Sequence, residues 1–516
     1  MQTRTSLALA GSAAVAAGLG AGHLLASLTD RRLSPVAVVG AVVIDAAPLS
    51  LKEWAIATFG TWDKAVLLVI VTAVTLGLGA LVGLLGRRQL AGGLAAGAVL
   101  AAVPWSLAAT RYGAGAHLVG AGTLLAGATA WTYLRRQALR LAPAGSARTG
   151  RPRTDSATTS TDAAPATSMT DPSRRRFLAQ AGAVAGGAGA LALAGTAAPD
   201  PAPAVTRTIP AAAQPLPPLP EGLPGITPFQ TPTEKLFRID IALTVPRVRA
   251  DDWTLQVTGM VDAPYTISYD ELLAMPMVEH DITLACVSNE VGGDLVGGAR
   301  WRGVPVAELL RRAQPRTGAD MLLSKGPDGF SASTPLSVLL DGRAALVAVA
   351  VNGEPLTPVH GFPARLVTPG LYGFVGATKW LRELRVTRFD RERAYWTTRG
   401  WSAYGPVKLA SRIDTPTGKK QLAPGQTVVG GVAWAGQGVS AVELQVDEGP
   451  WQPTTLGPQA GDDYWAQWMY VWDATPGQHR LRVRAVGKDG TTQTADRRPV
   501  APDGATGHHE VQVWVA

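Results

Sequence analysis

Long apolar stretches fill the first quarter of the chain and limit its fold more than any other feature. Each is close to the ~20 residues with which a helix crosses a bilayer. The sequence therefore predicts about five transmembrane helices over residues 1–134. The stretches cover approximately residues 6–28, 34–57, 64–86, 89–109 and 113–134.

Basic residues between these stretches predict the topology. Arginines occur at 31–32, 87–88 and 135–140. Because cytoplasmic loops carry an excess of Lys and Arg, these three loops are predicted to be cytoplasmic and the N-terminus outside. The loops near residues 52–64 and 111–112 would then also lie outside. Topology thus accounts for much of the net charge of +8, and nucleic-acid binding is not predicted.

An arginine-rich segment joins the apolar region to the rest of the chain. Residues 135–172 have no hydrophobic periodicity and predict a disordered cytoplasmic linker. The run Ser-Arg-Arg-Arg-Phe-Leu at 173–178 precedes an apolar stretch and resembles a twin-arginine export signal over residues 173–198. A sixth span with a basic flank is the alternative, and both place the following chain outside. No convincing Ala-x-Ala site is evident, which favours retention. Residues 199–224 predict a Pro/Ala linker.

Few polar residues interrupt the apolar stretches. His23 and His117 are predicted near opposite membrane faces, roughly 20 Å apart along the membrane normal, so no haem is evident. Asp45 is either a functional intramembrane acid or a solvated residue of an interfacial helix. The region is predicted to be an anchor, with a quinone or a partner protein as the unknown electron acceptor.

Cys286 is the only cysteine of the 516 residues and cannot form an internal disulfide. It ends the run Ile-Thr-Leu-Ala-Cys, which predicts a strand that leads into a loop at Ser288. A thiol there can offer a soft ligand to a metal or a nucleophile to a substrate. Taken alone, it is more typical of a buried structural cysteine, because free cysteine is among the most buried residue types.

From Gly225 the pattern becomes that of a soluble α+β domain. Residues 253–259 and 344–351 predict strands, and residues 268–273 predict a helix that begins with a capping box. Asn352-Gly353 predicts a hairpin turn. No Gly-x-Gly-x-x-Gly follows a strand, so a nicotinamide-binding domain is not predicted.

His360, Arg365 and Lys379 concentrate basic side chains in a glycine-rich stretch. Arginine can bind phosphate through two hydrogen bonds, and backbone N–H groups near Gly376 can complete an anion site. A solvated basic loop is the alternative interpretation of this stretch alone.

Taken together, these motifs resemble the sulfite oxidase family of molybdopterin enzymes. The cysteine strand, Asn-Gly-Glu-Pro-Leu at 352–356, His-Gly-Phe-Pro-x-Arg at 360–365 and Lys-Trp at 379–380 follow in that order, and the resemblance covers residues 225–516. It implies that Cys286 ligates molybdenum and that residues 225–400 form the molybdopterin-binding catalytic domain. The implied cofactor-binding residues are Phe237, Arg238, Ile239, Asp240, Cys286, Asp328, His360, Arg365, Ala377, Thr378 and Lys379.

One departure from the family concerns the substrate. Sulfite oxidases carry arginines shortly after the cysteine, whereas here Glu290 follows and would repel a dianion. Arg300, Arg399 or Arg412 could supply positive charge from elsewhere in the chain. Tyr395 is the candidate catalytic hydroxyl, with a packed aromatic as the alternative.

The last part of the chain predicts a β-sandwich. Short strands at 426–434, 441–447, 464–472 and 479–486 are separated by turns. The resemblance implies an immunoglobulin-like dimerisation domain over residues 401–516 and hence a homodimer. Its tryptophans are expected in core and interface packing rather than in a carbohydrate-binding face.

The sequence therefore predicts a multi-domain, membrane-anchored and outward-facing enzyme of the cell membrane. Its molybdenum-molybdopterin would transfer an oxygen atom to or from a small-molecule substrate. Two alternatives remain, namely a reductase of sulfoxide-type substrates at the same centre and a cofactor-free cell-surface binding protein. A transporter is disfavoured because the spans contain few polar groups.

Overall fold

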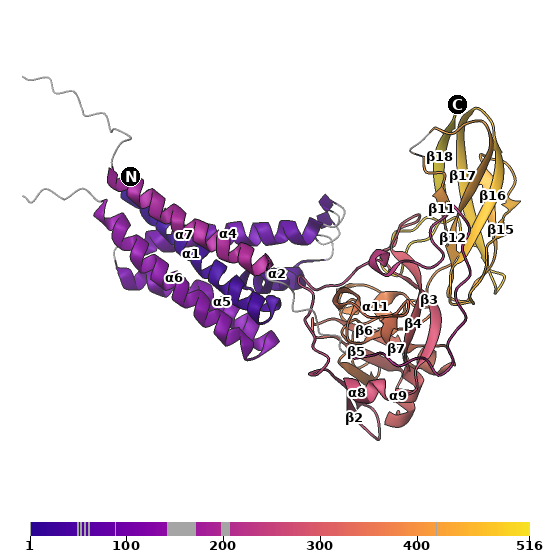
Figure 1. The fold of residues 1–516 in the computed structure, drawn as a ribbon, viewed down its shortest axis with the longest axis horizontal. Helices are drawn as coiled ribbons and strands as arrows, with labels where there is room; N and C mark the ends of the chain where they lie inside the picture. Colours follow the sequence, from indigo (N-terminus) through magenta and orange to yellow (C-terminus); the bar gives the residue numbers. More distant parts are fainter. Residues whose placement is uncertain are drawn as a thin grey trace, which may run out of the picture. The chain divides into compact units, whose positions relative to one another are not determined.

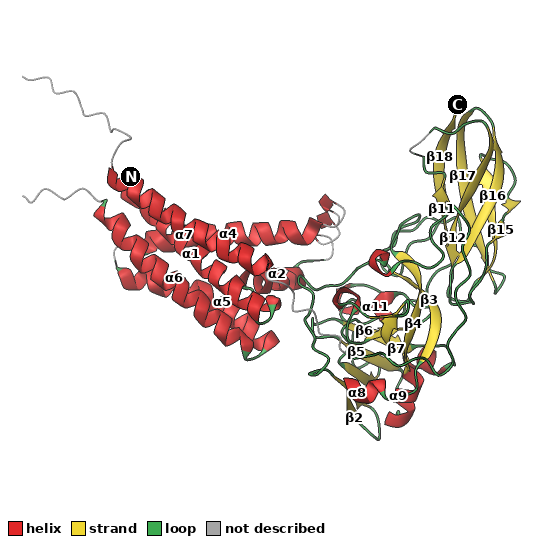
Figure 2. Cartoon of the chain, viewed as in Figure 1, coloured by secondary structure: helices red, strands yellow, loops and turns green. Residues whose placement is uncertain are grey.

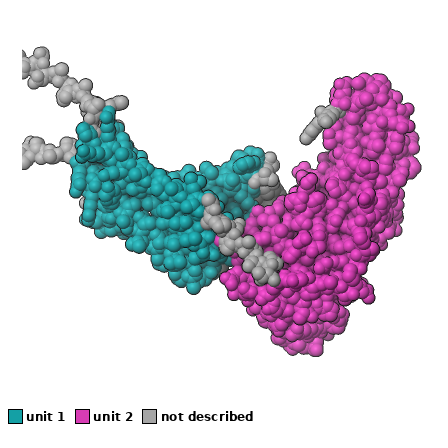
Figure 3. Space-filling view, viewed as in Figure 1, with its two compact units in different colours: residues 1–200, 242–244 teal, residues 201–241, 245–516 magenta. Residues whose placement is uncertain are grey.

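The computed structural model describes the chain except for residues 1, 49–50, 52–53, 56–57, 60–61, 88, 142–171, 198–206 and 419–420. It consists of two compact units (Figure 3). The first contains residues 1–200 and 242–244, and the second contains residues 201–241 and 245–516. The strands of the described chain all belong to the second unit.

The first unit is a helical bundle (Figures 1 and 2). Four of its described helices are long and apolar enough to cross a membrane, at Arg4–Leu28, Asp63–Leu85, Leu90–Thr110 and Pro172–Thr196. The main helices are α1 (Gln2–Leu28), α2 (Pro35–Ala46), α4 (Asp63–Leu85), α5 (Leu90–Tyr112), α6 (Gly115–Arg140) and α7 (Pro172–Ala197).

Glycines let these helices pack closely. A Cβ at Gly83 of α4 would lie 2.0 Å from the Leu7 carbonyl oxygen of α1, and one at Gly11 would lie 2.1 Å from that of Gly79. Such close backbone contact at small residues is typical of membrane helices. These two contacts between α1 and α4 also show that the helices are antiparallel, because the start of α1 meets the end of α4.

The helix directions correct the topology predicted from the arginines. The guanidinium of Arg32 lies 5.1 Å from the centre of the Tyr112 ring, so the loops at 31–32 and 111–112 lie at the same end of the bundle. They were predicted on opposite sides. His23 bonds Ser34 and His117 bonds Trp105, which also places both histidines toward this end. The predicted separation of His23 and His117 along the membrane normal, which was the argument against a haem, is therefore wrong.

Two predicted boundaries also change. The second stretch, expected to span residues 34–57, contains the 12-residue helix α2, which at 1.5 Å per residue is only about 18 Å long. Helix α6 continues to Arg140, six residues into the predicted linker, whose positions 142–171 lie outside the described residues.

Phe177 of α7 is 2% exposed and packs in a cluster with Leu7 of α1.

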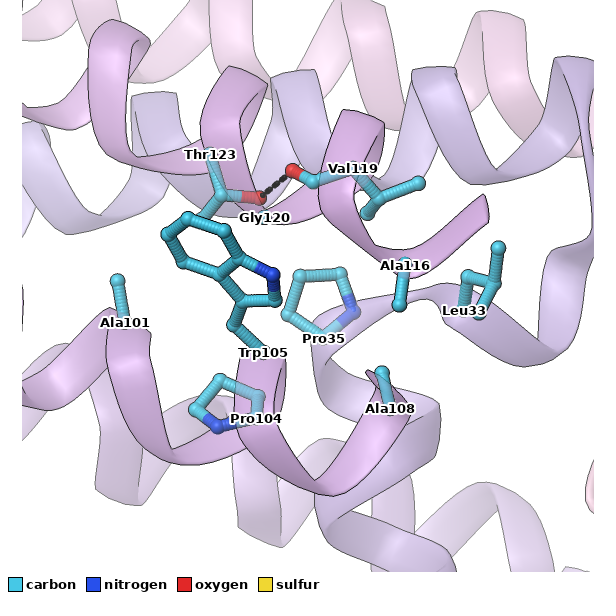
Figure 4. Close-up of a pocket in the computed structure, with 10 residues that line it drawn as sticks. All are labelled: Leu33, Pro35, Ala101, Pro104, Trp105, Ala108, Ala116, Val119, Gly120 and Thr123. Carbon is cyan, nitrogen blue, oxygen red and sulfur yellow. Dashed lines mark hydrogen bonds between the residues drawn. The ribbon is translucent and has the colours of Figure 1, made fainter. Parts of the chain in front are cut away.

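A small apolar pocket lies between α2, α5 and α6 (Figure 4). The Trp105 ring and the prolines Pro35 and Pro104 form much of its wall. The hydroxyl of Thr123 donates to the Val119 carbonyl within its own helix. The pocket therefore presents an almost wholly apolar surface.

The second unit begins with two five-stranded sheets. One has the order β2-β1-β10-β5-β6, in which only β1 and β10 pair in parallel. The other has the order β3-β4-β7-β8, with β9 also paired to β7. The strands are β1 (Thr254–Gly259), β2 (Tyr265–Ser268), β3 (Val278–Ala285), β4 (Val296–Pro305), β5 (Met321–Lys325), β6 (Ser331–Pro335), β7 (Leu346–Val351), β8 (Glu354–Pro355), β9 (Arg365–Val367) and β10 (Glu383–Thr387).

Local chemistry explains the elements that the sequence predicted here. Ser268 and Glu271 form a capping box at the start of α8 (Tyr269–Leu273). Asn352 and Gly353 both have positive φ, at 52° and 87°, and join β7 to β8 in the predicted hairpin. Helices α9 (Val306–Ala313), α10 (Leu336–Leu340) and α11 (Gly373–Gly376) complete the α+β part.

The last part is a two-layer β-sandwich. Its sheets have the orders β11-β12-β16-β15 and β14-β13-β17-β18, and all pairs named for them are antiparallel. Leu444 and Trp468, from opposite sheets, are fully buried in one core cluster. The strands are β11 (Ala410–Thr415), β12 (Gly425–Trp434), β13 (Val439–Val446), β14 (Gln452–Pro453), β15 (Thr455–Leu456), β16 (Ala466–Ala474), β17 (Gly477–Gly487) and β18 (His509–Val515).

Residues 207–229, here called the strap, were predicted as part of a linker up to residue 224 but belong to the second unit. The Leu216 amide donates to Glu279 and its carbonyl accepts from Arg300, at 3.1 and 3.2 Å. Further along, the Phe229 carbonyl accepts from both Tyr464 and Trp465. The strap therefore joins the α+β part to the sandwich. Proline-rich composition alone could not reveal these partners.

Candidate active site

Cys286 follows β3 directly and is 8% exposed. Its amide donates to the Leu295 carbonyl at 2.9 Å, which closes the loop of residues 287–295 at the point where β4 begins. Asn289, 9% exposed, accepts from the Leu295 amide through its side chain. Burial raises the pKa of the Cys286 thiol, while hydrogen bonds from Ser288 and the charge of Lys379 oppose this increase. The backbone of Cys286 is therefore fixed at the start of β4, and its thiol lies within the electrostatic influence of Lys379.

The three predicted basic residues meet in one buried cluster. His360 ends a short 3-10 helix at Pro358–His360, Arg365 begins β9, and Lys379 precedes β10. Gly361, with φ of +105°, makes this approach feasible, since a Cβ there would lie 3.1 Å from both the Arg365 Cβ and the Lys379 Cα. The side chains are 4%, 6% and 8% exposed.

The electrostatic properties of this cluster favour the binding of an anion. Burial lowers the pKa of Arg365 to about 10 and that of Lys379 to about 8. Burial and the two neighbouring cations lower the pKa of His360 to about 4, so it is neutral at pH 7. The Arg365 Nε is buried and has no hydrogen-bond partner among the described residues. Buried charge without full compensation is costly, and a phosphate would relieve it.

The predicted N-terminal segment joins this cluster. Asp240 accepts from Lys379 Nζ and from Arg238 Nε, both at 3.0 Å. Phe237 packs on a neighbouring core cluster, and the Ile239 side chain is 48% exposed. One carboxylate thus pairs with both Arg238 and Lys379, and the printed partners of Arg365 are backbone carbonyls.

The remaining predicted cofactor residues lie close to Lys379 in the chain or in space. The Ala377 carbonyl accepts from Arg365 at 3.4 Å. Thr378 is fully buried, and its hydroxyl lies 2.7 Å from that of Ser324. A Cβ at Gly326 would lie 2.8 Å from both Asp328 Oδ1 and the Lys379 carbonyl, which places Asp328 beside the site.

The structure gives other partners to the arginines proposed for the substrate. Arg300 forms a two-bond ion pair with Asp281, at 2.8 Å for each bond. The Arg399 guanidinium lies 3.5 Å from the centre of the Tyr395 ring. Arg412 donates to Asp414 and to the Gly293 carbonyl.

Tyr395, the predicted catalytic hydroxyl, packs with Phe330 and Trp396. Tyr372, which the sequence reasoning passed over, shares a core cluster with Ala285 and Val287 on either side of Cys286. Burial raises its pKa to about 12, and the charge of Cys286 acts in the same direction. In the sequence, Tyr372 lies between the motif at 360–365 and Lys379, and this position is the signal by which it could have been identified.

This site fits a phosphate-bearing cofactor with a soft metal. It combines one buried thiol with a buried basic cluster that Asp240 compensates only in part. The described residues contain no group of three or more His, Cys, Asp or Glu side chains that could hold a metal. A metal here would need most of its ligands from the cofactor. A molybdenum held by a pterin dithiolene and one thiolate has that requirement.

Comparison with known proteins gives the same chemistry. The oxidoreductase molybdopterin binding domain family matches residues 242–396. The uncharacterized oxidoreductase YuiH of Bacillus subtilis is 35% identical over 153 residues, which is 30% of this chain and 74% of that protein. Inducible nitrate reductase [NADH] 2 of Glycine max is 29% identical over 44% of this chain and 32% of its own length.

Mitochondrial sulfite oxidase of Rattus norvegicus is 28% identical over 45% of this chain, and the match spans 49% of that enzyme. Among solved structures, the sulfane dehydrogenase SoxCD of Paracoccus pantotrophus aligns over 52% of this chain and 75% of its own, at 23% identity and a TM-score of 0.47. The family match and the similarity to YuiH identify this chain as a molybdopterin-binding oxidoreductase of the sulfite oxidase type.

Proposed function

We propose that this chain is a membrane-anchored, extracytoplasmic enzyme that transfers an oxygen atom at a molybdenum ligated by Cys286. The combination of a buried thiol with a buried basic cluster that is compensated only in part carries the proposal. The relatives of known activity match over less than half of their length, so the substrate and the electron partner are part of the proposal.

The chain's residues would hold and orient the cofactor. When bound, molybdenum supplies the two-electron change that accompanies oxygen-atom transfer. Arg365 and Lys379 would bind the cofactor phosphate, and Asp240 would orient Lys379. His360, neutral at pH 7, would offer hydrogen bonds rather than charge. Cys286 would lose its proton on metal binding, because the thiolate is the ligand form.

The helix directions support the proposed orientation. The starts of α5 and α7 and the ends of α4 and α6 lie at one end of the bundle, where most of the flanking arginines lie. The pair at 31–32 lies at the other end, and Arg32 is neutralised there by Asp30 at 2.7 Å. The positive-inside rule then places the arginine-rich end and the N-terminus in the cytoplasm, and the catalytic part outside.

Molybdenum analysis of the full-length chain, purified in detergent from a host that makes molybdopterin, tests this function. We expect about one molybdenum per chain. The Cys286→Ser variant should keep its fold by circular dichroism and lose turnover. Wild-type protein that is folded but free of molybdenum would contradict the proposal and leave the cell-surface binding protein.

A sulfoxide-type substrate, reduced at the same centre, is the second candidate. The engagement of Arg300, Arg399 and Arg412 with other groups favours it, since a sulfite dianion needs an available positive charge. Turnover of a dialkyl sulfoxide with a reduced dye, without turnover of sulfite, would support this direction. The reverse result would support sulfite oxidation.

Two partners complete the proposal. Electrons would pass to or from a quinone or a partner protein in the membrane. The β-sandwich would mediate a homodimer, which light scattering of the purified protein can test.

A further inference from the structure

The loop that follows Cys286 is held by the β-sandwich as well as by its own sheet. Arg412 of β11 donates from Nη1 to the Gly293 carbonyl at 2.7 Å. Gly292 has φ of +81°, and a Cβ there would lie 2.3 Å from the His509 ring of β18. Both contacts come from strands more than a hundred residues further along the chain.

The Arg412 side chain is itself fixed. It is 9% exposed, its Nε donates to Asp414 Oδ1 at 2.6 Å, and its Nη2 donates to Thr227 of the strap at 3.3 Å. The Oδ2 of Asp414 is buried without a hydrogen-bond partner among the described residues. The carboxylate charge is therefore directed at Arg412.

From Gly293 the contacts lead back to the backbone of Cys286. The Gly293 amide donates to the Glu290 carbonyl at 2.9 Å, and the Asn289 amide donates to the Cys286 carbonyl at 3.1 Å. A charged hydrogen bond to a short closed loop restricts the whole loop, because the ends are already joined.

We propose that Arg412, oriented by Asp414, is a positioning residue through which the β-sandwich fixes the Cys286 loop against local opening. This role gives the contact between the sandwich and the catalytic part a purpose in the proposed function, because the contact holds the Cys286 loop in place. This role rests on Cys286 being the reactive group of the site.

Alkylation of the thiol provides a test that needs no molybdenum. Because Cys286 is the only cysteine, maleimide incorporation into the full-length chain reports on this loop alone. The protein would be purified in detergent from a host that makes no molybdopterin, and rates would be compared at one fixed pH. We expect Arg412→Met to increase the rate by about tenfold or more, the factor corresponding to a lost charged hydrogen bond.

Arg412→Lys keeps the charge and should restore most of the protection. Arg484→Met is the matched control. Arg484 lies on β17 of the sandwich and, like Arg412, donates to a carboxylate, that of Glu443 at 2.6 Å. The alkylation rate of Arg484→Met should equal that of the wild type. Melting temperatures would show whether each variant is folded.

An unchanged rate in folded Arg412→Met would overturn the inference, as would an equal increase in Arg484→Met. If Arg412→Met does not fold, Asp414→Asn decides, because it removes the charge that orients Arg412. A severalfold increase in its alkylation rate supports the proposal, and a rate equal to that of Arg484→Met overturns it. None of these results depends on metal binding. A failure here is therefore distinguishable from a failure to find molybdenum.

Discussion

Arg365 combines a permanent charge with almost complete burial. Its Nη1 donates to the His360 carbonyl at 3.2 Å, and its guanidinium lies 5.0 Å from the centre of the Trp301 ring. These contacts satisfy the side chain only in part, because Nε has no partner among the residues described. The energetic cost of such a residue explains why the site without its cofactor is expected to be a weak point of the fold.

At this scale, His360 predicts a pH dependence of stability. Its pKa in the fold is about 4, below the ordinary value of 6.5, so the unfolded chain takes up a proton first as pH falls. Stability should therefore decrease between about pH 6.5 and pH 4 in the cofactor-free protein. Urea unfolding across this range should show a smaller decrease in His360→Gln.

His479 is a control of opposite sign. Its hydrogen bond with Asp447 raises its pKa, so it contributes stability at low pH that is lost as pH rises through that pKa. His479→Gln should remove this contribution. Equal pH profiles for the wild type and His360→Gln would contradict the burial of a neutral imidazole.

At the scale of elements, the site is assembled from residues of two sheets. Cys286 follows β3 and Arg365 begins β9, both in the sheet that contains β4 and β7, whereas Lys379 precedes β10 of the other sheet. The segment that leads from β9 through α11 to β10 connects the two. The anion site therefore depends on how these sheets pack and not on one contiguous loop.

Inorganic phosphate or pyrophosphate should consequently stabilise the cofactor-free protein. An anion that binds only the folded state raises stability by about 2.7 kcal/mol at a hundred times its Kd. We expect its melting temperature to rise with phosphate in the wild type and to respond much less in Arg365→Met. Arg385→Met, which affects a more exposed ion pair with Glu392, should respond like the wild type. An equal response of the two variants would indicate nonspecific salt effects.

At the scale of the whole molecule, the strap changes where the catalytic half begins. Arg302 donates to the Pro210 carbonyl, and the Ala213 amide donates to the Met277 carbonyl. Leu219 packs on the cluster that contains Ala285 and Trp465. These contacts all lie before residue 225, where the sequence predicted the domain to start.

A fragment of residues 207–516 should therefore be more stable than one of residues 225–516. The shorter fragment leaves Glu279 and Arg300 without their strap partners and exposes part of the cluster around Leu219. Thermal unfolding should give a melting temperature several degrees lower for the shorter fragment. Coincident unfolding curves would mean that the strap contributes little.

The proposed orientation of the bundle predicts which loops are accessible outside the cell. In a Cys286→Ser background, Ala114→Cys at the α5–α6 turn should react with a membrane-impermeant maleimide in intact cells. Gln89→Cys, at the α4–α5 turn, should react only after permeabilisation. The opposite pattern would reverse the orientation and place the catalytic half in the cytoplasm.

Much of the local structure could be predicted from the sequence because its causes are local. The capping box at Ser268, the Asn352-Gly353 turn and the alternating strands of the sandwich depend on neighbouring residues only. The order of the cysteine, histidine, arginine and lysine motifs was sufficient to indicate the family. Long apolar stretches likewise determined that the first unit would be helical.

Only the tertiary structure decided which of these residues meet. The sequence could not place Arg32 beside Tyr112, or assign Arg412 to the Cys286 loop, because each contact joins segments far apart in the chain. It missed Tyr372 for the same reason and treated the strap as a linker, since a proline-rich segment acquires its hydrogen bonds from a surface that other segments build. Composition and spacing fix what a residue can do, whereas long-range packing selects the partner with which it does so.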